Sequence, residues 1–275
     1  MVETNIGLLG CGAIGELIAE AYEEGLLEDI NIIMVYDQDR LRAEKCASKI
    51  SKPPKIAENI NELVENPDIE LIVEAASQKA VKDHALKILE NGKNIMIMSV
   101  GALVDKEFYN QLVQTAKKRN KKIYIPSGAI AGVDAIKAAS IGKIYEVELI
   151  TRKPPSRFIS DKLPAGIEIN PNMKQPTVIF KGDAKTAQNF FPRSINVAAT
   201  LSLASLGPEL TKVTIIADPS IEENIHEIHV KGEFGTLKTY VENLPSIKNP
   251  KTSYLAALSA IKTLKKISEH IEIGT

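Results

Sequence analysis

A short glycine motif near the N-terminus constrains the fold more than any other feature of the sequence. The run Gly10-Cys11-Gly12-Ala13-Ile14-Gly15 follows an apolar strand candidate at 5–9 and leads directly into a helical pattern over 13–24. A strand, a turn with these glycine spacings and a helix are typical of a βαβ unit whose turn binds a dinucleotide. A plain glycine turn is the alternative. In the first interpretation the diphosphate lies on the helix N-terminus, held by Gly10, Gly12, Ala13, Ile14 and Gly15.

The first half of the chain alternates short apolar runs with longer amphipathic ones. Further strands are expected at 31–36, 70–74, 94–98 and 122–125, with helices at 39–49, 78–90 and 106–118. This alternation predicts a parallel sheet with helices on both faces. The strands are almost entirely apolar, as expected for strands that are buried on both sides. Residues 1–126 are therefore predicted to form a doubly wound Rossmann domain.

The second half has a different pattern. Strands are expected at 143–151, 177–181, 210–217, 225–232 and 236–241, with helices at 194–205 and 253–267 and a long loop at 154–176. Neighbouring strands without long helices between them favour an antiparallel sheet. The overall fold class is therefore α/β with a second α+β domain. We expect this domain to span residues 127–247, and residues 248–275 to carry a helix that returns to the first domain.

Composition limits the partners and the environment. The 34 basic and 35 acidic residues give a net charge of -1, so there is no basic field to attract nucleic acid. No apolar run approaches the ~18 residues of a membrane span, and the N-terminus lacks the pattern of a signal peptide. Cys11 and Cys46 have no Cys or His cluster around them, which argues against a metal site and a disulfide framework. These features favour a cytoplasmic protein that acts on a small molecule.

Asp37 is the candidate for selecting the cofactor. It ends the second predicted strand, where an acidic residue accepts hydrogen bonds from the ribose hydroxyls and favours NAD over NADP. A helix cap is the alternative role for this aspartate. Arg40 and Arg42 follow it and could accept a 2′-phosphate, so NADP remains possible.

Small residues follow two other buried strands. They can admit a nicotinamide or a ribose, or they can form ordinary turns. The candidates are Ala75, Ala76 and Ser99.

The histidines are the candidates for a catalytic residue that transfers protons. The chain has four. His84 lies within a predicted helix and His270 just past the last one, and both are expected at the surface. His226 alternates with Ile228 and Val230 along a predicted strand, so it points inward, whereas His229 points outward. A histidine with a pKa near 6.5 is suited to proton transfer at neutral pH. A core histidine without a catalytic role is the alternative.

Three further residues are candidates for ligand contacts. Arg152 and Lys153 end the first strand of the second domain and could bind a carboxylate, although a solvated basic edge is the alternative. Asn196 lies near the start of a predicted helix and could cap it or bind the carboxamide of a nicotinamide.

The whole chain resembles the L-aspartate dehydrogenase family. The motifs that carry the resemblance are the glycine loop, Ser127-Gly128-Ala129-Ile130-Ala131-Gly132, Arg152-Lys153-Pro154-Pro155, the run from Phe191 to Leu201, and Asn224-Ile225-His226-Glu227-Ile228.

The resemblance implies NAD- or NADP-dependent oxidative deamination of L-aspartate to iminoaspartate. The imine is then hydrolysed to oxaloacetate and ammonia or passed on toward NAD biosynthesis. It implies that His226 is catalytic, that Ala129 and Asn196 contact the nicotinamide, and that the protein is a homodimer. A related two-domain dehydrogenase, of the homoserine dehydrogenase or dihydrodipicolinate reductase type, is the nearest alternative. A non-catalytic NAD-sensing protein is the alternative from another functional class.

Overall fold

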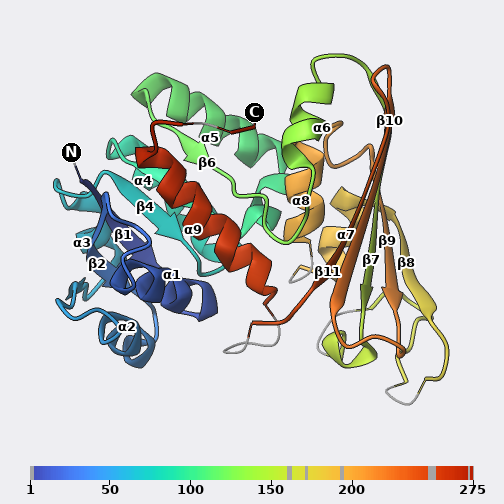
Figure 1. The fold of residues 1–275 in the computed structure, drawn as a ribbon, viewed down its shortest axis with the longest axis horizontal. Coiled ribbons are helices and arrows are strands. Elements are labelled where there is room, and N and C mark those ends of the chain that lie inside the picture. Colours follow the sequence, from blue (N-terminus) through green and yellow to red (C-terminus); the bar gives the residue numbers. More distant parts are fainter. Residues whose placement is uncertain are drawn as a thin grey trace. The chain divides into compact units, whose positions relative to one another are not determined.

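The chain forms two compact units, each with its own sheet (Figure 1). The computed structural model describes residues 3–159, 163–170, 173–192, 195–246, 252–271 and 273–274. Unit 1 consists of Met1–Pro126 and Ala257–Glu272, and unit 2 of Ser127–Ala256 and Ile273–Thr275. The expected domain boundary at residue 247 lies outside the described residues, as do Arg193, Ser194 and two short parts of the expected loop at 154–176.

Unit 1 contains a six-stranded sheet in the order β3-β2-β1-β4-β5-β6, with every strand pair parallel. The chain runs outward from β1 through β2 to β3 and then resumes at β4 on the other side of β1. This reversal is the topological switch point at which open α/β sheets bind ligands. The predicted Rossmann architecture is confirmed. Its strands are β1 (Thr4–Leu9), β2 (Ile30–Tyr36), β3 (Lys55–Ile56), β4 (Leu71–Glu74), β5 (Asn94–Ile97) and β6 (Ile123–Tyr124).

Helices cover this sheet and bury its apolar strands. They are α1 (Ala13–Glu23), α2 (Arg40–Ala47), α3 (Ile60–Glu65), α4 (Gln78–Glu90) and α5 (Lys106–Arg119), with a short 3-10 helix at Val100–Val104. The late helix α9 (Tyr254–Ser268) also contributes, because Ala260 and Leu264 are buried in one core with residues of β1, β2, α1 and α2 (Figure 1). Among the described helices, none is long and apolar enough to cross a membrane.

The sequence pattern did not identify two short elements of unit 1. Strand β3 has only two residues, and helix α3 has six. Elements of this length cannot show a hydrophobic period, because one helical turn alone takes 3.6 residues. The start of α3 is set locally, since the side chain of Asn59 accepts hydrogen bonds from the backbone N–H groups of Asn61 and Glu62.

Unit 2 contains a five-stranded mixed sheet in the order β11-β10-β7-β9-β8. Only β7 and β9 run parallel, and the other three pairs are antiparallel, as the strand pattern predicts. The strands are β7 (Ile144–Lys153), β8 (Thr177–Asp183), β9 (Thr211–Ala217), β10 (Asn224–Gly232) and β11 (Gly235–Asn243). A two-residue turn at Glu233 and Phe234 joins β10 to β11.

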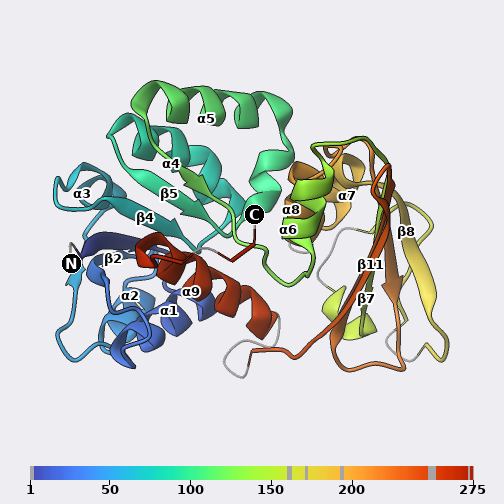
Figure 2. The ribbon, with the colours of Figure 1, turned by 45° about the horizontal axis from the view of Figure 1, so that its top comes forward.

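One face of this sheet is buried and the other is largely polar. The helices α6 (Val133–Ala139), α7 (Ala184–Phe190) and α8 (Asn196–Leu203) lie on one side of it (Figure 2). Of these, only α8 was expected, because α6 and α7 have seven residues each. Side chains alternate along β10, so that Ile228 and Val230 are buried while Lys231 is exposed. The same alternation determines which polar residues of β7 and β10 face inward.

Candidate functional site

The glycine loop between β1 and α1 has the geometry of a phosphate cradle. Gly10 has φ +101°, and a Cβ atom there would lie 2.7 Å from the backbone of Ala75 and Ala76. A Cβ atom on Gly15 would lie 2.3 Å from the carbonyl oxygen of Gly10, so only glycine allows helix α1 to approach the loop this closely. A Cβ atom on Gly12 would meet nothing within 4 Å, so the open space beside this residue is available to a ligand.

Helix α1 presents free donors to this space. Gly12 occupies the N-cap position and provides no side-chain hydrogen bond, and Ala13 and Ile14 are the first two helical residues. The first N–H groups of a helix have no partner within the helix, and the helix dipole places partial positive charge at this end. The loop therefore suits the diphosphate of a dinucleotide, the group for which the sequence motif is typical.

A cavity of about 200 Å³ lies beside the loop. It brings together the expected residues Gly10, Gly12, Asp37, Ala75 and Ala76 from the ends of β1, β2 and β4. The sequence pattern had not linked the remaining lining residues to the site. They are Leu9, Tyr36, Gln38, Arg42, Ser77, Ala80 and His84.

Asp37 is held at the edge of this cavity by two backbone hydrogen bonds. Its Oδ2 atom accepts from the N–H of Cys11 at 2.8 Å, and its Oδ1 atom accepts from the N–H of Asp39 at 2.9 Å. The side chain of Asp39, not that of Asp37, caps helix α2 by accepting from the N–H of Leu41. The helix-cap alternative for Asp37 is therefore wrong. Each of its oxygens keeps a lone pair for a ribose hydroxyl.

The two arginines near Asp37 have different positions. Arg42 lines the cavity and forms an ion pair with Asp39 at 3.3 Å. Arg40 pairs with Glu44 along helix α2 and is not among the lining residues. Of the two, Arg42 is therefore the one placed to meet a 2′-phosphate.

The buried carboxyl group of Glu74 holds the turn at 75–77 that lines the cavity. Glu74 is fully buried at the end of β4, and burial raises the pKa of its carboxyl group above the usual range. Its oxygens accept hydrogen bonds from Ser99 Oγ at 2.8 Å, Ser99 N–H at 3.0 Å and Ala76 N–H at 2.8 Å. Ser99 thus acts on the cavity through Glu74, since it does not line the cavity itself. The sequence pattern did not identify Glu74; an acidic residue at the end of an apolar strand is the signal that could have indicated this role.

In unit 2, His226 lies on the buried face of β10, as strand alternation predicts. Its side chain is almost fully buried, and its Nδ1 atom lies 3.0 Å from the hydroxyl oxygen of Thr151 on β7. Burial and, to a lesser extent, the positive charge of Lys153 lower the pKa of His226 to about 3. The imidazole is therefore neutral near pH 7 and can accept a proton. His229, on the other face, is half-buried, and His270 is exposed.

Strand alternation separates Arg152 from Lys153. Thr151 pairs with His226, and Lys153, two residues further along β7, lies on the same face of the sheet. Arg152 lies on the opposite face, where its guanidinium pairs with Glu227 at 3.2 Å and Asp218 at 3.7 Å. Two carboxylates thus already neutralise Arg152, whereas Lys153 shares the face of the buried histidine.

Two asparagines continue the His226 face toward the end of the sheet. Asn224 on β10 is directly opposite Asn243 on β11, and both are buried. The side-chain N–H₂ of Asn243 donates to the carbonyl oxygen of Ala129 at 3.1 Å, which anchors the Ser127–Gly132 loop to the sheet. Among the described residues, neither asparagine Oδ1 atom has a hydrogen-bond partner. Buried acceptors without a partner are costly, so this end of the sheet can accept hydrogen bonds from a ligand.

Asn196 is the first residue of helix α8 and is half-buried. The N-cap position belongs to Ile195, so the alternative of Asn196 as a helix cap is wrong. Ala129 is buried within unit 2. Four of the expected site residues belong to unit 2: Ala129, Asn196, Lys153 and His226. The glycine loop and Asp37 belong to unit 1.

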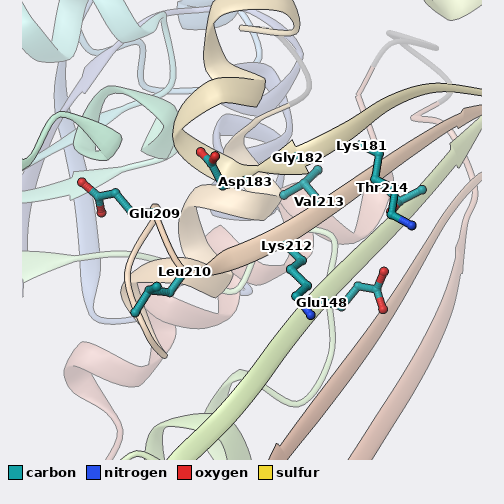
Figure 3. A pocket seen from close by; sticks show the side chains of 9 residues that line it. All are labelled: Glu148, Lys181, Gly182, Asp183, Glu209, Leu210, Lys212, Val213 and Thr214. Atoms are coloured by element: carbon teal, nitrogen blue, oxygen red, sulfur yellow. The ribbon is translucent and has the colours of Figure 1, made fainter.

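Unit 2 also has a shallow hollow of about 340 Å³ on its sheet (Figure 3). Glu148 and Lys212, which pair in register on β7 and β9, lie beside each other there, and Asp183 and Glu209 lie further along its rim (Figure 3). Glu148 points to the opposite side of the sheet from Thr151 and His226, because Glu148 and Thr151 are three positions apart along β7. The hollow contains no residue that the sequence motifs single out, and it is separate from the His226 face.

Comparison with known proteins relates both units to one family. Residues 134–267 match the family model described as "Aspartate dehydrogenase, C-terminal", and residues 10–126 match "Homoserine dehydrogenase, NAD binding domain". The L-aspartate dehydrogenase of Methanosarcina barkeri is 46% identical over 272 residues, which cover 98% of this chain and 99% of the relative. That of Methanococcus maripaludis strain C6 is 47% identical over 270 residues, with the same coverage of both chains.

The chain belongs to the L-aspartate dehydrogenase family. The crystal structure of aspartate dehydrogenase from Thermotoga maritima agrees, with a TM-score of 0.77 and 29% identity over 99% of this chain and 100% of that one. A myo-inositol dehydrogenase from Lactobacillus casei, solved with NAD(H) and myo-inositol, shares the fold with a TM-score of 0.54 and 16% identity. The resemblance seen in the sequence motifs is thus confirmed. The match of residues 10–126 to an NAD-binding domain agrees with the cavity beside Gly10.

Proposed function

We propose that this chain is an L-aspartate dehydrogenase. It oxidises L-aspartate to iminoaspartate with the loss of two electrons and two hydrogens, and water then converts the imine to oxaloacetate and ammonia. The observation that carries this proposal is the 46% identity, over nearly the whole of both chains, with relatives that are named L-aspartate dehydrogenase. The reaction requires a bound cofactor and a proton acceptor. The glycine loop in unit 1 suits the cofactor, and the neutral buried histidine in unit 2 can accept the proton.

The cofactor is a nicotinamide dinucleotide, and we propose NAD as the preferred form. The N-terminus of α1 and the space beside Gly12 suit its diphosphate, and Asp37 would accept hydrogen bonds from the adenosine ribose. A 2′-phosphate would meet the carboxylate of Asp37, although Arg42 in the same cavity offers partial compensation. When bound, the nicotinamide would accept the hydrogen and the electron pair that leave the substrate α-carbon. We propose that Ala129 and Asn196 contact the nicotinamide.

His226 is the proposed proton acceptor. An amino acid enters with a protonated amino group, which must lose a proton before the carbon–nitrogen double bond can form. The neutral imidazole of His226 can take this proton, and it can later take a proton from the water that attacks the imine. Its low pKa keeps the imidazole neutral throughout the neutral pH range.

Lys153 is the proposed ligand for a substrate carboxylate. L-aspartate brings two carboxylates, and Lys153 is a cation on the same sheet face as His226. Arg152 was an equal candidate in the sequence, but it faces the other side and is paired with Glu227 and Asp218. A charge-assisted hydrogen bond from Lys153 contributes about 1.5–3 kcal/mol to binding.

Three further properties are also proposals. The protein is proposed to act in the cytoplasm and to form a homodimer. Its imine product is proposed to enter NAD biosynthesis. Gel filtration with light scattering tests the dimer, and a mass of 30.0 kDa in solution would contradict it.

The test of the proposed function is a substrate panel with purified protein. Reduction of the nicotinamide is expected with L-aspartate, and little or none with homoserine or glutamate. Lys153→Met is expected to raise KM for aspartate by about 10–100-fold, whereas the matched Arg152→Met variant keeps the wild-type KM. Turnover of homoserine in place of aspartate would contradict the proposal.

A further inference from the structure

Among the described residues, the hydroxyl group of Thr151 is the hydrogen-bond partner of the buried histidine in unit 2. Thr151 on β7 is the register partner of His226 on β10, and the two side chains are each only 2% exposed. The distance from Thr151 Oγ1 to His226 Nδ1 is 3.0 Å, a normal hydrogen bond. Since both residues lie within the paired stretch of β7 and β10, the sheet itself holds the two groups together.

This bond bears on which ring nitrogen carries the proton. A neutral imidazole has one N–H group, and the other nitrogen carries a lone pair. If Nδ1 donates to Thr151, then Nε2 has the free lone pair and can act as a base. If the hydroxyl instead donates to Nδ1, then Nε2 carries the proton and has no lone pair with which to accept another. The partner of Nδ1 thus sets the role of Nε2.

We propose that Thr151 is a positioning residue that accepts the Nδ1–H of His226 and so keeps Nε2 free as the base. This inference rests on the proposed function, because it assigns a role in that same reaction. The acceptor is uncharged, in contrast to a carboxylate behind a histidine. A carboxylate would favour the imidazolium, whereas a hydroxyl orients the ring and leaves it neutral.

The surroundings of the imidazole agree with a neutral base. On β11 its register partner is Val241, and on its own strand the neighbours on the same face are Asn224 and Ile228. Among the described residues, Lys153 is the charged group that acts on the ring, and its charge also disfavours the imidazolium. Among the described residues, the hydroxyl of Thr151 is therefore the group that can orient the ring through a hydrogen bond.

The experiment compares Thr151→Val, which keeps the shape but loses the hydroxyl, with Thr151→Ser, which keeps the hydroxyl. Thr214→Val is the matched control, because Thr214 lies on β9 on the opposite face of the same sheet. Thr151→Val is expected to lower kcat for aspartate by about 10-fold with little change in KM for NAD. Thr151→Ser is expected to recover most of the rate, and Thr214→Val to keep it.

Nitrogen NMR of labelled histidine provides a readout that packing alone would not change. In the wild-type protein, His226 is expected as the neutral tautomer with its proton on Nδ1, and in Thr151→Val as a mixture of tautomers. A proton on Nε2, or an imidazolium near neutral pH, would overturn the proposal, as would a serine variant as slow as the valine variant. The NMR result is obtained whether or not the protein oxidises aspartate, so failure of this inference can be told from failure of the proposed function.

Discussion

Acidification is expected to destabilise the folded protein through His226. In the unfolded chain this histidine has an ordinary pKa of 6.5, and in the fold burial lowers it to about 3. Between these two values the unfolded state binds a proton that the folded state does not bind. The stabilisation associated with the neutral ring is therefore fully present above pH 6.5 and is lost as the pH falls toward 3.

The magnitude follows from the size of this window. A pH of about 4 lies about 2.5 units below the pKa of the unfolded histidine, and each unit changes the free energy of unfolding by about 1.4 kcal/mol. His226 alone is thus expected to lower the free energy of unfolding by about 3 kcal/mol between about pH 7 and about pH 4. This is a large share of the 5–15 kcal/mol that is typical of folded proteins.

The assay is urea unfolding followed by circular dichroism at both pH values for the wild type and His226→Gln. Other titrating groups act in both proteins, so the difference between them isolates His226. The wild type is expected to lose about 3 kcal/mol more than the variant. Thr214→Val, on the other face of the sheet, serves as the control and is expected to follow the wild type. Equal losses in the wild type and His226→Gln would refute the reasoning.

Three further variants test the site. His226→Ala is expected to lower turnover by roughly 10²–10⁴-fold with little change in NAD affinity, and a rate near that of the wild type would remove His226 from the mechanism. Asp37→Ala is expected to weaken NAD more than NADP in a binding titration, and equal weakening would speak against a ribose contact. Glu74→Ala leaves the N–H groups of Ser99 and Ala76 without an acceptor. We therefore expect the free energy of unfolding to fall by about 3 kcal/mol and both cofactors to bind more weakly. Unchanged stability would show that Glu74 is dispensable.

Much of the fold follows from local patterns in the sequence. The strands and helices of unit 1 with clear apolar periods were all expected, and helix α4 begins and ends at the expected residues, 78 and 90. The inward direction of His226 follows from the two-residue period of β10. The short elements β3, α3, α6 and α7 could not be predicted, because they are no longer than two helical turns and show no clear hydrophobic period.

The details of the site depend on contacts between distant parts of the chain. The sequence treats Arg152 and Lys153 as equivalent. Strand alternation puts them on opposite faces, and only the register of β7 with β10 shows that Lys153 is the one that shares the face of His226. Likewise, nothing in the sequence near residue 151 indicates that Thr151 meets His226, because that contact joins residues that are 75 positions apart. Such pairings are set by strand register, which local composition does not encode.

The central claim is that hydrogen leaves the α-carbon of L-aspartate and reaches the nicotinamide. Its most direct test uses L-aspartate with deuterium at the α-carbon, the purified protein and NAD, followed by mass spectrometry of the reduced cofactor. The account predicts reduced cofactor that carries one deuterium, together with unlabelled oxaloacetate and ammonia. Reduced cofactor without deuterium, or no reduction despite bound NAD, would contradict it.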